Sequence, residues 1–352
     1  MEPTVNYEGV ILSGMRPTGD LHLGHFEAVL RNWLKLQKDY RCFYFVADWH
    51  AITTDTDTRA LKKDSFEIVK DWLAFGIDPK LATIFIQSEV PEHAELSLAL
   101  ERLVNIGPLN RLPTFKAYLE HLAGDRKVFD EKGSLLQGDD RLSRLANAEV
   151  SVGFLTYPVL QAADILLYDT THVPVGEDQK PHIELTRELA KRFNALYGKV
   201  FTIPEVMLSS NVVLLRGSDG RKMSKSYGNA LLPTSTPEEI KAGVNKYVTY
   251  RKRLTDKGDP YECPVFDLHR AFNPSEEIEI NKACRDASIR CVECKSKLPG
   301  IIADSYSAYR ERRQHITYDE IRDILTQGAT VAREVASRKM AQVKHHMLMD
   351  YK

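Results

Sequence analysis

The sequence predicts an α/β protein with a doubly wound parallel sheet, followed by a second, helical domain. Over about the first 235 residues, short apolar runs alternate with segments of helical periodicity. This order is typical of parallel strands joined by crossover helices. Beyond that point the alternation stops and the pattern is helical. A chain of 352 residues is also long for one hydrophobic core, so two domains are expected.

The elements of the first domain follow from the length and spacing of its apolar runs. Runs of three to six residues suit buried parallel strands, and apolar residues at every third or fourth position indicate helices. The expected strands are 10–12, 42–47 and 83–86, and the expected helices are 26–34, 66–73 and 177–197. On the last of these helices, Leu185, Leu189, Phe193 and Leu196 should share one face, and Gly198 should end it.

The domain boundary is expected near residue 235, where Pro233 and Pro237 enclose a polar segment. Glu238 and Glu239 then suit the positive end of a new helix. The sequence thus predicts a catalytic domain at 1–235, with a connecting insertion at about 89–150, and a helical domain at 236–352. Within the insertion, 124–146 is polar and contains glycines, which indicates an added or mobile connection.

Composition indicates an ordinary soluble protein, with 43% hydrophobic and 28% charged residues. The first ten residues lack the features of a signal peptide, and the least charged stretch, 150–163, is too short to cross a bilayer. We therefore expect a cytoplasmic protein that needs neither a membrane nor DNA. The net charge of −1 does not indicate a nucleic-acid partner, although basic clusters at 251–253, 310–313 and 333–344 leave that open.

The first motif that indicates chemistry lies where the first strand runs into a helix, in the segment 17–25 (PTGDLHLGH). The start of a helix offers unpaired N–H groups and the positive end of a dipole, which attract phosphate. His22 and His25 lie one helical turn apart and can both donate hydrogen bonds to phosphate oxygens. Taken alone, such a pair of histidines is more often structural.

The second motif, at 220–226 (GRKMSKS), has the composition of a mobile phosphate clamp. Its two lysines and its hydroxyl groups can neutralise charge that grows on a leaving pyrophosphate in the transition state. A solvated basic loop is the ordinary alternative for such a run. The two motifs together are more specific than either one, and they resemble, in the same order, both signatures of class I aminoacyl-tRNA synthetases. Residues 222–226 match the second signature letter for letter.

Other segments are similar to one family of that class, the tryptophanyl-tRNA synthetases. The resemblance is carried by 157–168 (YPVLQAADILLY), 173–179 (VPVGEDQ), 9–25, 47–53 and 86–91. It covers nearly the whole chain except 124–146, which is longer than usual. The resemblance implies a Rossmann-like catalytic domain that holds ligands at the carboxyl ends of its strands.

The resemblance also implies roles for single residues. Asp164 would accept the indole N–H of tryptophan, and Tyr157 and Gln179 would hold its α-amino group. The other residues expected around tryptophan are Gly14, His50, Gln161, Ile165, Val173 and Val175. The residues expected to contact ATP are Arg16, Pro17, Thr18, Gly24, His25, Gly176, Glu177, Asp178, Val213, Lys222, Met223, Ser224, Lys225 and Ser226. The residues expected in catalysis are His22, His25, Lys116, Lys222 and Lys225.

Two positions depart from many members of that family. Gln161 stands where many relatives have Met, and Arg16 where many have Gln. Because tyrosyl-tRNA synthetases share Gln161, and because a carboxylate can accept from a phenol as well as from an indole, a tyrosyl enzyme stays open as an alternative. The form Gly-Glu-Asp-Gln at 176–179 favours tryptophan.

Four of the five cysteines lie close together in the second domain, in the spacing C-x20-C-x6-C-x2-C. Four thiolates can hold a [4Fe–4S] cluster or Zn²⁺, and the spacing does not match the paired knuckles of common zinc sites. Four buried thiols that merely pack are the third possibility. A subgroup of tryptophanyl-tRNA synthetases resembles this region and carries a [4Fe–4S] cluster there. The expected ligands are Cys263, Cys284, Cys291 and Cys294, whereas Cys42 should be a core residue of a strand.

The expected reaction has two steps. ATP and Mg²⁺ would convert tryptophan to tryptophanyl-adenylate and pyrophosphate, and the tryptophanyl group would then pass to tRNA(Trp), whose anticodon the helical domain would read. The resemblance also implies a homodimer. Besides the tyrosyl enzyme, two alternatives remain at this point: another adenylate-forming nucleotidyltransferase, and a catalytically silent protein that binds tRNA or tryptophan.

Overall fold

The computed structural model describes residues 7–351 except 55, 125–133, 209–212 and 254. A five-stranded parallel sheet lies at the centre of the catalytic part, in the order β3-β2-β1-β4-β5. The strands are β1 (Val10–Met15), β2 (Arg41–Val46), β3 (Ala82–Ile86), β4 (His172–Val175) and β5 (Glu205–Leu208). The strand order reverses between β1 and β4, and this is the place where open α/β sheets bind ligands. The predicted parallel α/β fold is confirmed.

Both faces of the sheet are buried, so successive residues of one strand enter different cores. In β2, Cys42, Tyr44 and Val46 join one hydrophobic cluster, and Phe43 and Phe45 join the other. The first cluster is covered by α1 (Leu23–His25), a π-helical turn at Phe26–Leu30, α2 (Arg31–Asp39) and α4 (Leu61–Phe75). The second is covered by α5 (Glu92–Glu101), α9 (Val152–Leu167) and α10 (Lys180–Tyr197). Cys42 is 1% exposed, as expected of a core residue.

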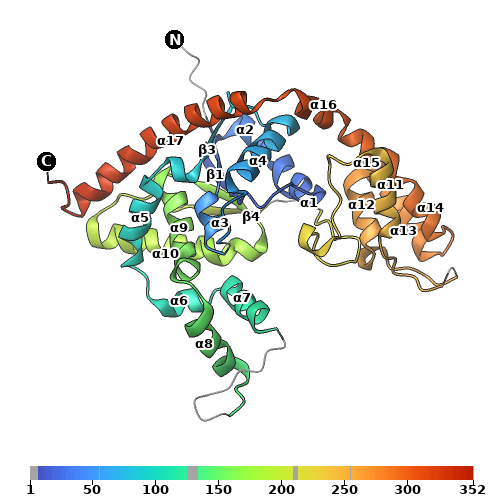
Figure 1. Ribbon diagram of the computed structural model, residues 1–352, viewed down its shortest axis with the longest axis horizontal. Coiled ribbons are helices and arrows are strands. Elements are labelled where there is room, and N and C mark those ends of the chain that lie inside the picture. Colours follow the sequence, from blue (N-terminus) through green and yellow to red (C-terminus); the bar gives the residue numbers. More distant parts are fainter. Residues whose placement is uncertain (1–6, 55, 125–133, 209–212, 254, 352) are drawn as a thin grey trace.

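A group of short helices extends away from the sheet between α5 and α9 (Figure 1). It comprises α6 (Ile106–Asn110), α7 (Pro113–Ala123) and α8 (Gly138–Glu149). The sequence predicts an added or mobile polar connection at 124–146. Residues 125–133 lie outside the described residues, but 138–149 forms a helix. Its Leu142 and Ala146 pack against the second core cluster, and Leu145 is 5% exposed.

The second part of the chain is helical, as predicted. It begins with α11 (Pro237–Lys246), where Thr236 caps the helix and Glu239 completes the capping box. The following helices are α12 (Pro264–Phe272), α13 (Glu277–Arg285), α14 (Cys291–Ser296), α15 (Leu298–Ser305), α16 (Ser307–His315) and α17 (Tyr318–His346). No described helix is both long enough and apolar enough to span a bilayer.

The helices α16 and α17 return to the sheet domain (Figure 1). On α16, Tyr309 donates to Asp71 Oδ1 at 2.7 Å, and Arg313 pairs with the same carboxylate at 2.7 Å. The helix α17 packs along β3, the edge strand, so closely that a Cβ at Gly328 would lie 1.8 Å from the carbonyl oxygen of Ile84. Only glycine fits there, and the helix covers an edge that would otherwise be open.

Candidate active site

A cavity of about 600 Å³ opens at the carboxyl ends of β1 and β4. It lies at the reversal of strand order, where the fold predicts a ligand. On α9, the cavity-lining residues Tyr157, Gln161 and Asp164 recur at three or four positions and therefore share one face of the helix. All nine residues expected around tryptophan line this cavity: Gly14, His50, Tyr157, Gln161, Asp164, Ile165, Val173, Val175 and Gln179. Arg16 and Gly176, expected at ATP, also line it.

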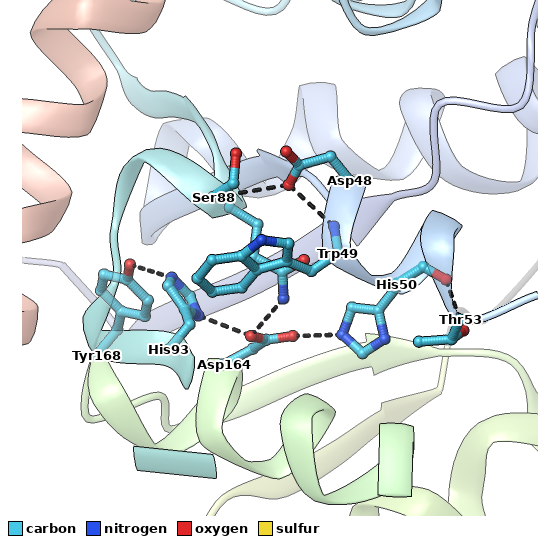
Figure 2. A network of polar contacts seen from close by, with 9 residues as sticks. Asp48, Trp49, His50, Thr53, Ser88, His93, Asp164 and Tyr168 are labelled. Carbon is cyan, nitrogen blue, oxygen red and sulfur yellow. Dashed lines mark hydrogen bonds and ion pairs between the residues drawn. The ribbon is translucent and has the colours of Figure 1, made fainter. Parts of the chain in front are cut away.

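Asp164 lies at the buried end of the cavity and accepts hydrogen bonds from three side chains (Figure 2). Its Oδ2 lies 2.7 Å from His50 Nε2. Its Oδ1 accepts from Gln87 Nε2 and lies 2.7 Å from His93 Nδ1. Burial alone would raise the pKa of Asp164, but the electrostatic attraction and hydrogen bonds of the His50 and His93 rings outweigh it and lower the pKa to about 2. The carboxylate is therefore ionised at neutral pH.

Gln87, His93 and Tyr168, which complete this network, were not found by sequence reasoning. His93 is fully buried and uses both ring nitrogens, since its Nε2 lies 2.8 Å from the hydroxyl of Tyr168. A signal for Gln87 and His93 exists in hindsight: both follow the carboxyl end of β3, at the same edge of the sheet as the cavity. The segment after β3 is connected to α3 (Asp48–Ile52) by a hydrogen bond, in which the backbone N–H of Ser88 donates to Asp48 Oδ1 at 3.0 Å.

The hydroxyl of Tyr157 belongs to a second small network at the cavity wall. It donates to Thr114 Oγ1 at 2.8 Å and lies 2.9 Å from His182 Nε2. Burial lowers the pKa of His182 to about 4, so its ring is neutral and can accept at Nε2. Thr114 and His182 were also missed, although His182 follows the predicted Gln179 by three residues.

The two histidines of the first motif lie on top of each other at the start of α1. Their ring centroids are 3.8 Å apart, as their one-turn spacing predicts. Burial, assisted by the positive charge of Lys225, lowers the pKa of His22 to about 4. Burial and the neighbouring His22 lower the pKa of His25 to about 3. Both rings are therefore neutral at pH 7, so each can donate one hydrogen bond without adding charge.

The second motif lies against the first. The backbone N–H of Leu23 donates to the carbonyl of Leu231 at 2.9 Å, and Met223 is buried in the core. Lys225 Nζ lies 3.6 Å from Asp20 Oδ2, and both lysines of the motif are exposed to solvent. The structure thus brings Lys222 and Lys225 to the side of the histidine pair, and their charges lower the pKa of both histidines.

Asn229 holds this second motif in shape and was not found from the sequence. Its Nδ2 donates to Asp219 Oδ1 at 2.7 Å and to the carbonyl of Lys222 at 3.1 Å. Its Oδ1 accepts from the backbone N–H of Ser224 at 2.8 Å. Asn229 is 3% exposed, so all three bonds are shielded from water.

The other residues expected at ATP or in catalysis do not line the cavity. Lys116 is exposed on α7, and Val213 is packed against the first core cluster. The side chain of Ser226 lies outside the described ones. Seven further residues expected at ATP are described by the structure but do not line the cavity: Pro17, Thr18, Gly24, Glu177, Asp178, Met223 and Ser224. They lie within the two motifs or just after β4 instead.

The four cysteines of the helical part are neighbours. Cys263 precedes α12, Cys284 lies in α13, and Cys291 and Cys294 lie in α14. Burial and then the other three thiols raise the pKa of Cys294 to about 12. Nevertheless, among the described side chains no group of three or more His, Cys, Asp or Glu is arranged to hold a metal ion.

A parallel sheet whose first strand leads into His-Leu-Gly-His, with Lys-Met-Ser-Lys-Ser packed beside it, defines a class I aminoacyl-tRNA synthetase. The family model for class I tRNA synthetases (W and Y) matches residues 6–306. The tryptophan–tRNA ligase of Thermotoga maritima is 45% identical, over 96% of this chain and 98% of that protein. The one of Aquifex aeolicus is 40% identical, over 96% and 99%.

A crystal structure of tryptophanyl-tRNA synthetase from Campylobacter jejuni has a TM-score of 0.77 and 30% identity, over 96% of this chain and 99% of that one. The chain therefore belongs to the tryptophanyl-tRNA synthetases. The expected family and enzyme class are confirmed, and these relatives favour this assignment over a tyrosyl enzyme, another nucleotidyltransferase or a silent binding protein.

Proposed function

We propose that this chain activates tryptophan with ATP and transfers it to tRNA(Trp) in the cytoplasm. In the first step, the tryptophan carboxylate attacks the α-phosphate of ATP, and pyrophosphate leaves. In the second, a terminal ribose hydroxyl of the tRNA attacks the carbonyl carbon of the adenylate, and AMP leaves. The structure of the Campylobacter jejuni relative carries tryptophan and ADP, which supports one site for both substrates.

The observation that carries the proposal is an ionised, fully buried Asp164 at the end of a largely apolar cavity. Such a carboxylate needs a donor from the ligand, and an indole supplies one N–H within a flat apolar ring. The apolar walls of the cavity include Ile165, Val173 and Val175. Tyr157 and Gln179 lie at the wall and would hold the α-amino group, while Gln161 would lie along the ring.

ATP would lie along the carboxyl ends of β1 and β4, with its phosphates between the two motifs. Neutral His22 and His25 would donate hydrogen bonds to phosphate oxygens, and Lys222 and Lys225 would offset the charge that develops on pyrophosphate. Lys116 would have to approach from α7. Mg²⁺, when bound to ATP, would supply further positive charge on the phosphates. No side chain serves as a covalent nucleophile, so the rate would come from positioning and charge.

The helical domain, 236–352, would bind the tRNA anticodon, and two copies of the chain would form a homodimer.

A [4Fe–4S] cluster in the helical domain would be held by Cys263, Cys284, Cys291 and Cys294, with Zn²⁺ as the alternative. Four thiols on neighbouring helices supply the donor set that iron and zinc prefer. Purification without oxygen should then give a brown protein that contains iron. A colourless protein without iron or zinc would contradict this part of the proposal alone.

Exchange of pyrophosphate into ATP, measured with tryptophan and with tyrosine in parallel, tests the central claim. We expect exchange with tryptophan alone. Exchange with tyrosine alone would overturn the amino-acid assignment, with Gln161 as the residue to revisit. No exchange with either would contradict the activation step itself.

A further inference from the structure

The hydrogen bonds around Asp164 leave few ways for a ligand to bind it. A carboxylate offers about four acceptor positions, two on each oxygen. Both positions of Oδ1 are used, by Gln87 and His93. Of the two positions of Oδ2, His50 uses one. Among the described residues no further donor reaches Asp164, so one acceptor position remains, on an oxygen of a residue that lines the cavity.

His93 can fill its place in this network in only one neutral form. Its Nδ1 lies 2.7 Å from Asp164 Oδ1 and must carry the proton, because a lone pair there would face the carboxylate. The other nitrogen, Nε2, is then an acceptor and needs a donor. The hydroxyl of Tyr168, which is 2.8 Å away and 2% exposed, supplies it. Tyr168 therefore selects the tautomer of His93.

Neither His93 nor Tyr168 lines the cavity, so neither touches a ligand in it. Their effect on a ligand passes through Asp164. Without the donor at Nδ1, one acceptor position of Oδ1 would be unfilled and the carboxylate could rotate. It would then no longer present a single, fixed acceptor to the ring of the amino acid.

We propose that His93, held in one tautomer by Tyr168, is a positioning residue that sets amino-acid specificity. It limits Asp164 to one free acceptor position, which matches a ring bearing one N–H and no acceptor. A phenol can donate to the same position, but its own oxygen then lacks a donor, which makes its burial unfavourable. This inference rests on the proposed activation of tryptophan.

The test compares tryptophan with its benzothiophene isostere, in which sulfur replaces the ring N–H. The measured quantity is the ratio of kcat/KM for the two amino acids in pyrophosphate exchange, with the full-length enzyme. The wild-type ratio should be about 10⁴, the range of sites built to accept a substrate donor. In His93→Leu the ratio should fall at least about tenfold, while the KM for ATP stays unchanged, since only the single-acceptor geometry is lost.

Two conservative variants separate the roles of the residues. His93→Asn keeps an N–H near the position of Nδ1 and should restore part of the ratio. Tyr168→Phe removes one oxygen and should lower the ratio less than His93→Leu does. The control is Tyr309→Phe, which loses a buried hydroxyl bonded to Asp71; neither residue lines the cavity. It should lower thermal stability and leave the ratio unchanged.

Equal losses for both amino acids in a folded His93→Leu, with an unchanged ratio, would overturn the inference. If that variant does not fold, an unchanged ratio in Tyr168→Phe overturns it. Wild-type enzyme that exchanges pyrophosphate with neither tryptophan nor the isostere would instead contradict the proposed function. The two failures are therefore distinguishable.

Discussion

The two ends of the active site are built in opposite ways. At the amino-acid end, Asp164 is fully buried and held by three side-chain donors. At the phosphate end, Lys222 and Lys225 are exposed, and Lys225 forms a long ion pair of 3.6 Å with Asp20. The first end is fixed before a ligand arrives, whereas the cations of the second are free to move.

This difference fits the two tasks. Discrimination between similar rings requires acceptors that cannot adjust to the wrong ligand, so they are buried and held in place by hydrogen bonds. Stabilisation of a departing pyrophosphate requires charge that follows the phosphates during the reaction, so long flexible side chains on a loop serve it. The following changes break one end or the other, and the expected effects decrease in order.

The largest effect should come from Asp164→Asn. Both carboxylate oxygens accept hydrogen bonds, so an amide must turn its NH₂ toward a donor at one end or the other. We expect kcat/KM for tryptophan in pyrophosphate exchange to fall by about 10⁴. The KM for ATP should be little affected, because the phosphate end is intact. An activity close to wild type would mean that the ligand does not use this carboxylate.

Lys225→Ala should have the next largest effect. Loss of one cation at the leaving group should lower kcat for activation by about 10² to 10³, since the charge that it offsets is greatest in the transition state. Tryptophan affinity, measured by calorimetry, should barely change. Lys241→Ala, an exposed lysine on α11, is the control. Normal turnover with lost tryptophan binding would show that the role of Lys225 is misassigned.

A smaller loss is expected from Asn229→Asp. The change removes both N–H donors that hold Lys222 and Asp219, and it places two carboxylates side by side. We expect kcat to fall about tenfold through lost positioning of the loop, with tryptophan KM unchanged. Adding Asp219→Asn should recover part of the rate, because the amide then donates in the opposite direction. No recovery in the double variant would argue against this contact as the cause.

The last comparison concerns stability against pH rather than rate, and buried histidines contribute to it at both ends. His22 and His25 have a pKa of about 4 and about 3 when folded, against about 6.5 in an unfolded chain. The unfolded chain therefore binds more protons below pH 6.5, and these histidines make stability fall as the pH drops from 6.5 towards 4. At the amino-acid end, burial lowers the pKa of His182 to about 4, so this histidine acts in the same pH range, whereas the lowered pKa of Asp164 acts only further down, from about 3.8 to about 2.

Urea unfolding of the wild type and of a His22→Gln, His25→Gln variant, measured at pH 7 and pH 5, separates these contributions. The variant should lose less stability between the two pH values. The same loss in both proteins would show that the histidines titrate normally in the folded state.

Much of the amino-acid end could be predicted because its residues lie in two short segments of the chain. The helical spacing of Tyr157, Gln161 and Asp164 already places them on one face of a helix. His93 and Gln87 come from a different segment, more than 70 positions away from Asp164. Their position after β3 places them at the right edge of the sheet, but their residue types do not distinguish a buried partner of a carboxylate from an ordinary polar residue.

Other expectations failed for local reasons. Leu196 was expected on the buried face of α10 but is 65% exposed, because it lies in the last turn, beyond the packed residues Leu189 and Phe193. The helix α8 was not expected because its sequence is polar and begins at a glycine. Pairing of Asn229 with Asp219 depends on a tight loop, and periodicity says nothing about such loops.

The contact between Gly328 and Ile84 has a consequence for the order in which the protein is made. Because synthesis runs from the N-terminus, β3 leaves the ribosome more than 230 residues before α17 does. Until α17 emerges, the edge of the sheet is uncovered on the nascent chain, with free backbone groups that other strands could pair with. The sheet of the catalytic half therefore depends on a helix far along the chain to cover its edge strand. A chain released before Gly328 is made would keep that edge exposed and able to pair with other strands.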